Sequence, residues 1–299
     1  MKSMDLIVFN VDHGLCVLVR TPNGYGVMID VGCRRDFSPA EWVADGNIVL
    51  TPFNNRRLAK LIVTHPHDDH VEGISKLIKY LPPAILQRRK DIDWDQILNP
   101  PNQDPSLNAK EFYRWQSAYD QPAKSLPDYG CDLQIFGLTR SDLESLGGQL
   151  QNQVNNGSYV SVFTWTFDGF TWKIVVCGDN ETKGLEALLQ QQKFRDTISG
   201  ARILVTPHHG HTSGYSGEFM KAIGNPDLII TSVQSQGESD HVEQSYQVYS
   251  KGIIFDGKMR RHLTTRKDGH IWLSLTPGCY EFKKVTESNI LFRLFASLR

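Results

Sequence analysis

Three histidines and two aspartates fall within residues 65–70. Imidazole and carboxylate groups are the ligands that Zn²⁺ and its first-row neighbours prefer. Because side chains alternate along an extended segment, His65 and His67 point the same way. Asp69 and His70 follow where the chain turns into a helix, so they can serve a second metal beside the first. A solvated surface loop is the alternative, but so many ligand types at a strand end favour a metal site.

Three apolar stretches each run into residues that can bind metal. Residues 58–63 lead to the cluster just described, residues 174–177 lead to Asp179, and residues 203–205 lead to three more histidines, His208, His209 and His211. Functional groups of α/β proteins gather at the carboxyl ends of strands, where loops are free to present side chains. Three such ends in one chain indicate one shared site rather than separate core histidines.

The elements that must position these residues follow from the hydrophobic pattern. Short apolar runs separated by Gly, Pro and Asn predict strands, and apolar positions at helical spacing over 71–81 predict a helix that ends at Pro82. Strands are expected at 6–11, 16–20, 26–30, 58–63, 159–163, 170–177, 201–206, 228–233, 252–255 and 271–275, and further helices at 184–192 and 219–223. Residues 84–150 look like a loop-rich insertion with one helix, lying over the scaffold.

The composition is that of an ordinary globular protein. The chain has 299 residues, 40% hydrophobic and 22% charged, which supports a sizeable core, and we expect one domain over 1–299. A formal charge of −1 argues against holding long duplex nucleic acid by charge alone, although a locally gripped strand stays compatible.

The chain carries no signal of export or membrane insertion. Its start lacks the features of a secretory signal, and no stretch approaches the roughly 20 apolar residues that cross a bilayer. Its five cysteines are widely spaced and form no Cys-x-x-Cys pair. We therefore expect a cytoplasmic protein without a disulfide framework or a thiolate zinc site. The apolar run at 290–295 could pack on the body or on a second copy, which is compatible with a homo-oligomer.

The histidine and aspartate motifs together resemble those of the metallo-β-lactamase superfamily. The resemblance implies an α/β fold, a four-layer αββα sandwich, here with the insertion at about 84–150 and a C-terminal extension at about 280–299. Within the superfamily, the chain most resembles the metallo-β-lactamase domain of the DNA-uptake competence protein ComEC and its soluble relatives. That likeness rests on residues 10–14, 21–24, 29–32, 155–158, 207–210 and 268–269.

Carried over by position, the resemblance implies a binuclear site with two divalent ions, Zn²⁺ or Mn²⁺. His65 and His67 would hold metal one, Asp69 and His70 would hold metal two, and Asp179 would bridge them. The last ligand would be His208 or His209, and we favour His208 because it stands closer to the strand end. Asp30 would orient the ligand loops.

The chain departs from the superfamily at the third histidine of metal one. No histidine occurs between residues 71 and 207, and the run 155–158 stands where that ligand would come. Asn155 or Asn156 could supply an amide oxygen, a weaker and harder ligand than imidazole, with Ser158 beside it. Metal one would then be weakly held or filled by Mn²⁺. The alternative is that these residues only form a turn.

A binuclear site of this kind implies hydrolysis. The metals would lower the pKa of a bridging water to ~7, giving a metal-bridged hydroxide that can attack a phosphodiester, such as a single-stranded nucleic acid or a nucleotide. His209 and His211 are candidates for steadying charge or protonating the leaving group beside the catalytic carboxylates Asp69 and Asp179. His13 and His241 could face the same pocket. His262 and His270 read as surface residues.

Two other classes of function remain open from the sequence. The same hydroxide attacks carbonyl groups, so the chain could be an ester, thioester or lactam hydrolase. It could also be a non-catalytic, metal-stabilised binding module, although a pure scaffold has no need of a complete open site.

Overall fold

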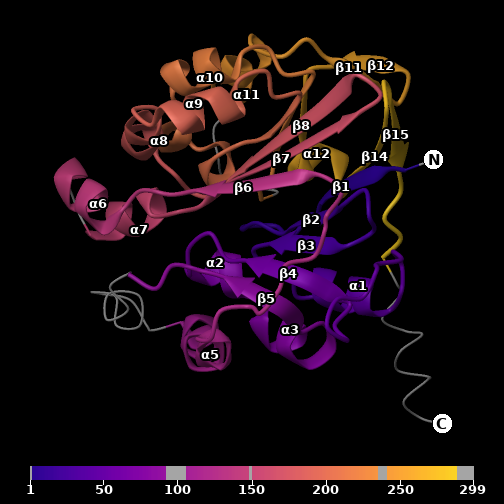
Figure 1. Cartoon of the computed structure of the whole chain (residues 1–299). Coiled ribbons are helices and arrows are strands. Elements are labelled where there is room, and N and C mark those ends of the chain that lie inside the picture. The colour runs from indigo at the N-terminus through magenta and orange to yellow at the C-terminus, as the bar shows by residue number, and fades with distance from the viewer. Residues whose placement is uncertain (1, 92–105, 148–149, 235–240, 288–299) are drawn as a thin grey trace.

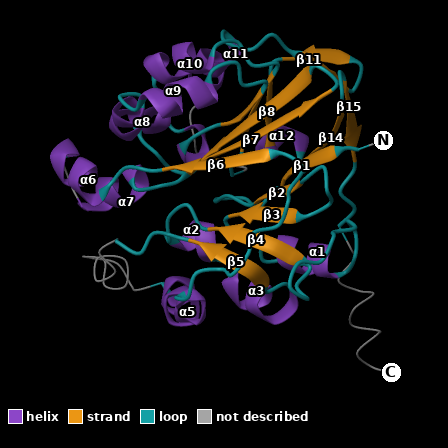
Figure 2. Cartoon of the chain, viewed as in Figure 1, coloured by secondary structure: helices purple, strands orange, loops and turns teal. Residues whose placement is uncertain are grey.

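Two β-sheets face each other in the middle of the molecule, and helices cover their outer faces (Figures 1 and 2). The structure is a computed structural model that describes residues 2–91, 106–147, 150–234 and 241–287. The first sheet has the order β15-β14-β1-β2-β3-β4-β5. Its strands are β1 Met4–Val8, β2 Val17–Arg20, β3 Gly26–Ile29, β4 Leu58–Ile62, β5 Pro83–Gln87, β14 Ile271–Thr276 and β15 Cys279–Lys283.

The second sheet has the order β13-β10-β9-β8-β7-β6, and the hairpin β11-β12 stands apart from both sheets. Antiparallel pairing joins β6, β7 and β8, whereas β8, β9, β10 and β13 run parallel. The strands are β6 Asp132–Phe136, β7 Val160–Phe167, β8 Phe170–Cys177, β9 Ile203–Val205, β10 Leu228–Thr231, β11 Ile253–Phe255, β12 Lys258–Arg260 and β13 His262–Thr264.

Three apolar clusters separate four layers. One cluster fills the space between the sheets and includes Leu6 of β1 and Val176 of β8. Because successive side chains of a strand face opposite ways, Ile7 joins a second cluster on the outer face of the first sheet, and Val175 joins a third on the outer face of the second sheet. The arrangement confirms the predicted αββα sandwich.

The helices divide between the two outer layers. The first sheet is covered by α1 Pro39–Ala44, α3 Ile74–Tyr80 and α5 Leu107–Gln116. The one-turn helix α2 Asp68–Val71 comes directly before α3 in the chain. Those on the second sheet include α8 Thr182–Leu188, α9 Gln192–Ile198, α10 Gly217–Ile223 and α11 His241–Gln247. The other helical segments are η1 Ser117–Tyr119, α6 Arg140–Leu146, α7 Leu150–Asn156, η2 His208–Gly210, η3 Thr212–Gly214 and α12 Thr265–Asp268.

The expected insertion at 84–150 is wrong at its two ends, because both belong to the sandwich. Strand β5 is the edge of the first sheet, and β6 is the edge of the second. Pro83 opens β5, where a missing N–H is tolerated at a strand start on a sheet edge, so the proline pair read as a helix stop also begins a strand. Residues 92–105 lie outside the described part.

The C-terminal extension also begins inside the sheet. Strand β15 pairs antiparallel with β14, and the chain beyond it is held by Trp42, whose indole N–H donates to the carbonyl of Thr286 at 3.1 Å. The apolar run at 290–295 lies outside the described residues. Among the described residues, none of the helices is both long and apolar enough to cross a membrane.

Candidate metal centre

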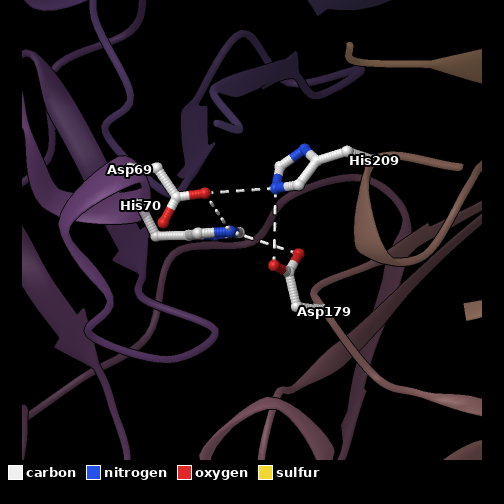
Figure 3. Close-up of side chains that lie close together, drawn as sticks. All are labelled: Asp69, His70, Asp179 and His209. Atoms are coloured by element: carbon white, nitrogen blue, oxygen red, sulfur yellow. Dashed lines mark ion pairs between the residues drawn. The ribbon is translucent and has the colours of Figure 1, made fainter. Parts of the chain in front are cut away.

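Strand ends from both halves of the sandwich meet at one place (Figure 3). Asp69 and His70 lie in α2, just after β4, while Asp179 follows β8 and His209 follows β9. One ligand atom from each of these four residues lies within 4.8 Å of all the others. The site therefore forms only when the two halves pack together.

The four side chains have the geometry of ligands to one ion. The Nε2 atom of His209 lies 3.2 Å from Asp69 Oδ2 and 3.4 Å from Asp179 Oδ2. The Nε2 atom of His70 lies 3.2 Å from Asp179 Oδ1 and 3.6 Å from Asp69 Oδ2. Ligand atoms about 2.0–2.2 Å from one ion are at most about 4.4 Å apart, so all four distances fit. The cluster corresponds to the half-site expected for metal two.

In both imidazoles of this half-site, the Nδ1 atom is hydrogen-bonded and fixes the orientation of the ring. His70 Nδ1 lies 2.7 Å from Asp30 Oδ2, and His209 Nδ1 lies 3.2 Å from the carbonyl of Ser232. These oxygens only accept, so each ring carries its hydrogen on Nδ1 and turns Nε2 into the site. Both Nε2 atoms are buried without a hydrogen-bond partner. Because such orphans are rare and costly, the residues fit a bound divalent cation.

The charges of the site favour a cation as well. Burial alone would lower the pKa of His209, but the nearby carboxylates of Asp179 and Asp69 raise it to about 10. Burial would likewise raise the pKa of Asp179, but His209 and His70 hold it well below its usual value. The carboxylates therefore stay ionised, and a divalent cation has to compete with protons on the two imidazoles.

A second pair of predicted ligands, His65 and His67, lies beside Asp179. His65 Nε2 and His67 Nδ1 are 3.0 Å apart, and His65 Nε2 lies 3.9 Å from Asp179 Oδ2. Ser158 connects Asp179 with His65, since its Oγ accepts the N–H of Asp179 at 3.0 Å and lies 3.2 Å from His65 Nδ1. Asp179 Oδ1 thus faces His70, and Oδ2 faces both His65 and His209, so the carboxylate lies close to the ligands of both predicted half-sites.

The structure separates the two asparagines considered for the vacant ligand position. Asn156 Oδ1 accepts the N–H groups of Glu181 and Gly184 at 2.9 and 3.1 Å, so it holds the start of α8. Asn155 Oδ1 is buried without a hydrogen-bond partner, and Asn155 interacts with His67 and Glu181. Of the two, Asn155 faces the metal-one half.

We favoured His208 over His209 as the last ligand, but the geometry places His209 with Asp69, His70 and Asp179. The backbone is left-handed at His208 (φ 45°) and His209 (φ 51°), so distance from the strand end does not decide which ring reaches Asp69. His208 Nε2 lies 4.0 Å from Asp179 Oδ2, and its Nδ1 lies 2.8 Å from Ser213 Oγ.

The remaining candidates lie at the rim or elsewhere. His13 is half-exposed, with Nε2 3.4 Å from Asp69 Oδ2. His211 hydrogen-bonds Ser213 beside His208. His241 begins α11, and its side chain lies outside the described part. His262 is buried under Thr231 rather than on the surface, because β13 adds to the parallel sheet.

Three residues that support the site escaped the sequence reasoning. Thr64 donates its hydroxyl to Asp30 at 2.6 Å and lies 3.3 Å from His65 Nδ1. Arg89, from a charge run typical of solvated surfaces, is buried and donates to the carbonyls of Leu138 and Gly157. Ser213 holds His208, as described above. Of the three, only Thr64 could have been found from the sequence, because it directly precedes the cluster that begins at His65.

Comparison with known proteins agrees with this reading of the fold. Residues 9–94 match the family model described as "Metallo-beta-lactamase superfamily". A search of curated proteins found no match.

Solved structures of metallo-β-lactamases align at low identity. A motif mutant of the metallo-beta-lactamase from Cronobacter sakazakii is 17% identical over 69% of this chain and 77% of that one, with a TM-score of 0.36. The beta-lactamase from Chitinophaga pinensis is 11% identical over 72% and 89%, also at 0.36. The family match includes the cluster that begins at His65, so over residues 9–94 the chain is similar to the metallo-β-lactamase superfamily.

Proposed function

We propose that the chain hydrolyses phosphodiesters at a binuclear centre. The carrying observation is the position of the Asp179 carboxylate between two sets of ligands, with Oδ1 facing His70 and Oδ2 facing His65 and His209. Two divalent cations held by these residues would suit displacement at phosphorus, because they would activate water near neutral pH and offset negative charge on the phosphate oxygens.

The protein's own groups would hold and orient this chemistry. Asp30 and the Ser232 carbonyl fix the rings of His70 and His209, so their Nε2 atoms need no rearrangement. At the rim, the half-exposed His13 presents an imidazole beside Asp69, where it can donate a hydrogen bond to a phosphate oxygen. Asn155 presents its buried oxygen on the His67 side.

The rim beside α2 favours a short substrate over a long polyanion. Asp12, Asp68 and Glu72 are exposed there. Partial burial and the carboxylates of Asp68, Asp69 and Asp12 raise the pKa of Glu72, which shows how closely these charges gather. A nucleotide or the end of a single strand avoids this rim, whereas duplex nucleic acid would extend across it and be repelled. We therefore propose that the substrate is a nucleotide or the end of a single strand.

The test uses bis-p-nitrophenyl phosphate with Mn²⁺ or Zn²⁺ added to metal-depleted protein. We expect metal-dependent hydrolysis that Asp179→Asn abolishes. Asp168→Asn is the matched control, because this exposed aspartate lies in the turn that precedes β8, at the opposite end from Asp179. Hydrolysis of nitrocefin or p-nitrophenyl acetate without cleavage of the phosphodiester would instead assign the centre to carbonyl substrates and refute the proposal.

A further inference from the structure

Two consecutive histidines after β9 both turn toward the same oxygen of Asp179. We propose that His208 supplies the third imidazole of the half-site built on His65 and His67, while His209 serves the other half-site. The inference rests on the metal centre of the proposed function, but it does not depend on which substrate is cleaved. It fills the ligand position that the absence of histidine between residues 71 and 207 leaves open.

Distances place His208 and His65 alike with respect to the bridging carboxylate. His208 Nε2 lies 4.0 Å from Asp179 Oδ2, and His65 Nε2 lies 3.9 Å from the same atom. Both separations are within the roughly 4.4 Å that two ligands of one ion can span. His208 therefore stands within reach of an ion that His65 and Asp179 share.

The hydrogen bonds around Ser213 determine which nitrogen of His208 is free. The backbone N–H of Ser213 donates to His211 Nδ1 at 3.2 Å, so that nitrogen is an acceptor. Ser213 Oγ, 2.8 Å from the same nitrogen, must then donate its only hydrogen there. Hence Ser213 Oγ accepts from His208 Nδ1 at 2.8 Å.

The lone pair of neutral His208 is therefore on Nε2, the atom that faces Asp179 Oδ2. A lone pair and a carboxylate oxygen are both acceptors, so no hydrogen bond joins them. A cation between the two atoms turns this unfavourable pair into two ligands. Neutral imidazole with its other nitrogen hydrogen-bonded is the usual form of a metal-binding histidine.

The local backbone is built for this divergence of neighbouring rings. His208, His209 and Gly210 all have left-handed φ angles, which non-glycine residues adopt mainly where surrounding structure enforces them. Gly214 makes room for the first ring, since a Cβ there would lie 2.8 Å from His208 Cβ. The strained turn lets two adjacent side chains reach one carboxylate from different directions.

Metal binding by the full-length chain tests the proposal without any substrate. Metal-free protein is titrated with Zn²⁺ and with Co²⁺ against a chelator, and the number of ions and the affinity of each are measured. We expect two ions in the wild type. His208→Ala should keep one ion at wild-type affinity and bind the other at least 10–100-fold more weakly, the loss typical of residues that only support a ligand.

Variants of the neighbouring histidines assign the ions to half-sites. His209→Ala should retain the ion that His208 binds, and the double variant His208→Ala/His209→Ala should hold neither tightly. Thr212→Ala is the matched control, because Thr212 is exposed in the same turn and takes no part in the hydrogen bonds that join His208, Ser213 and His211; both affinities should stay at wild-type values. If circular dichroism shows that His208→Ala does not fold, Ser213→Ala gives the same pattern with a smaller loss.

Three outcomes would overturn the assignment. Wild-type affinities in both His208→Ala and Ser213→Ala would remove His208 from the centre. A double variant that binds like His209→Ala would place both histidines on one ion, and loss of the second ion in Asn155→Ala but not in His208→Ala would give the position to the amide. A wild type that binds no ion would refute the metal centre itself, whereas failure to cleave phosphodiesters with both ions bound would refute only the proposed function.

Discussion

Replacing Asp30 by asparagine should weaken metal binding although Asp30 itself does not face the metals. Its carboxylate is fully buried and accepts three hydrogen bonds, from Thr64 N–H at 2.7 Å, from Thr64 Oγ1 at 2.6 Å and from His70 Nδ1 at 2.7 Å. Asparagine has nearly the same shape and tolerates the left-handed backbone at this position, where φ is 56°. The substitution therefore changes hydrogen bonding with little change in packing.

The expected magnitude follows from these three contacts. One carboxylate oxygen becomes an NH₂ group, and either orientation of the amide sets it against a donor, Thr64 N–H or His70 Nδ1–H. Leaving a buried donor unpaired costs about 1–3 kcal/mol of unfolding free energy. To restore a bond, His70 must move its hydrogen to Nε2, which removes the lone pair that faces Asp179. Loss of such an orienting partner typically weakens metal binding 10–100-fold, about 1.4–2.7 kcal/mol.

Competition with a chelator measures this loss, and thermal denaturation of the metal-free protein measures the stability. Asp168→Asn is the control, because Asp168 also has a left-handed backbone, with φ of 52°, but is exposed and remote from the site. If Asp30→Asn bound both ions with wild-type affinity, His70 would not depend on Asp30 for its orientation, and the argument from hydrogen bonding would fail.

The two asparagines and the pH dependence give further predictions. Because His208 already fills the third imidazole position, Asn155→His should leave Zn²⁺ affinity close to that of the wild type, whereas Asn156→His should lower the melting temperature by removing the oxygen that accepts the N–H groups of Glu181 and Gly184. A gain of tenfold or more in Asn155→His would return the ligand position to residue 155. In the metal-free protein the pKa of His209 is raised to about 10, so its stabilising ion pairs are fully present below about pH 6.5 and are lost as the pH rises through about 10. Thermal melts should therefore show wild type losing its advantage over His209→Gln across that range, and a constant difference would contradict the assignment.

Local patterns predicted the central strands and the meeting of their carboxyl ends, whereas the αββα sandwich was implied by the resemblance to the metallo-β-lactamase superfamily. Apolar segments such as 58–63 and 174–177 are buried on both faces, so their hydrophobicity is visible without tertiary information. Edge strands lack this signal. Strand β6 is mostly half-exposed and alternates polar with apolar residues over only five positions, and β5 begins at Pro83, so both were assigned to an insertion.

The choice between adjacent residues could not be made from sequence. Which of His208 and His209 reaches Asp69 depends on two left-handed φ angles, and the sequence shows only the glycine that follows them. The side-chain oxygens of Asn155 and Asn156 differ in their hydrogen bonding. The backbone N–H groups that donate to Asn156 belong to Glu181 and Gly184, at the start of α8. Such partners are brought together only by the packing of the two halves.

The number of divalent ions bound per chain shows whether the strand ends form a binuclear centre. Elemental analysis of protein purified with added Mn²⁺ or Zn²⁺, after removal of free metal, should find more than one ion per chain in the wild type. Asp179→Asn should lose most of this metal, because its carboxylate lies between both half-sites. Asp168→Asn should retain it. A wild-type protein that binds no divalent ion after supplementation would contradict the account.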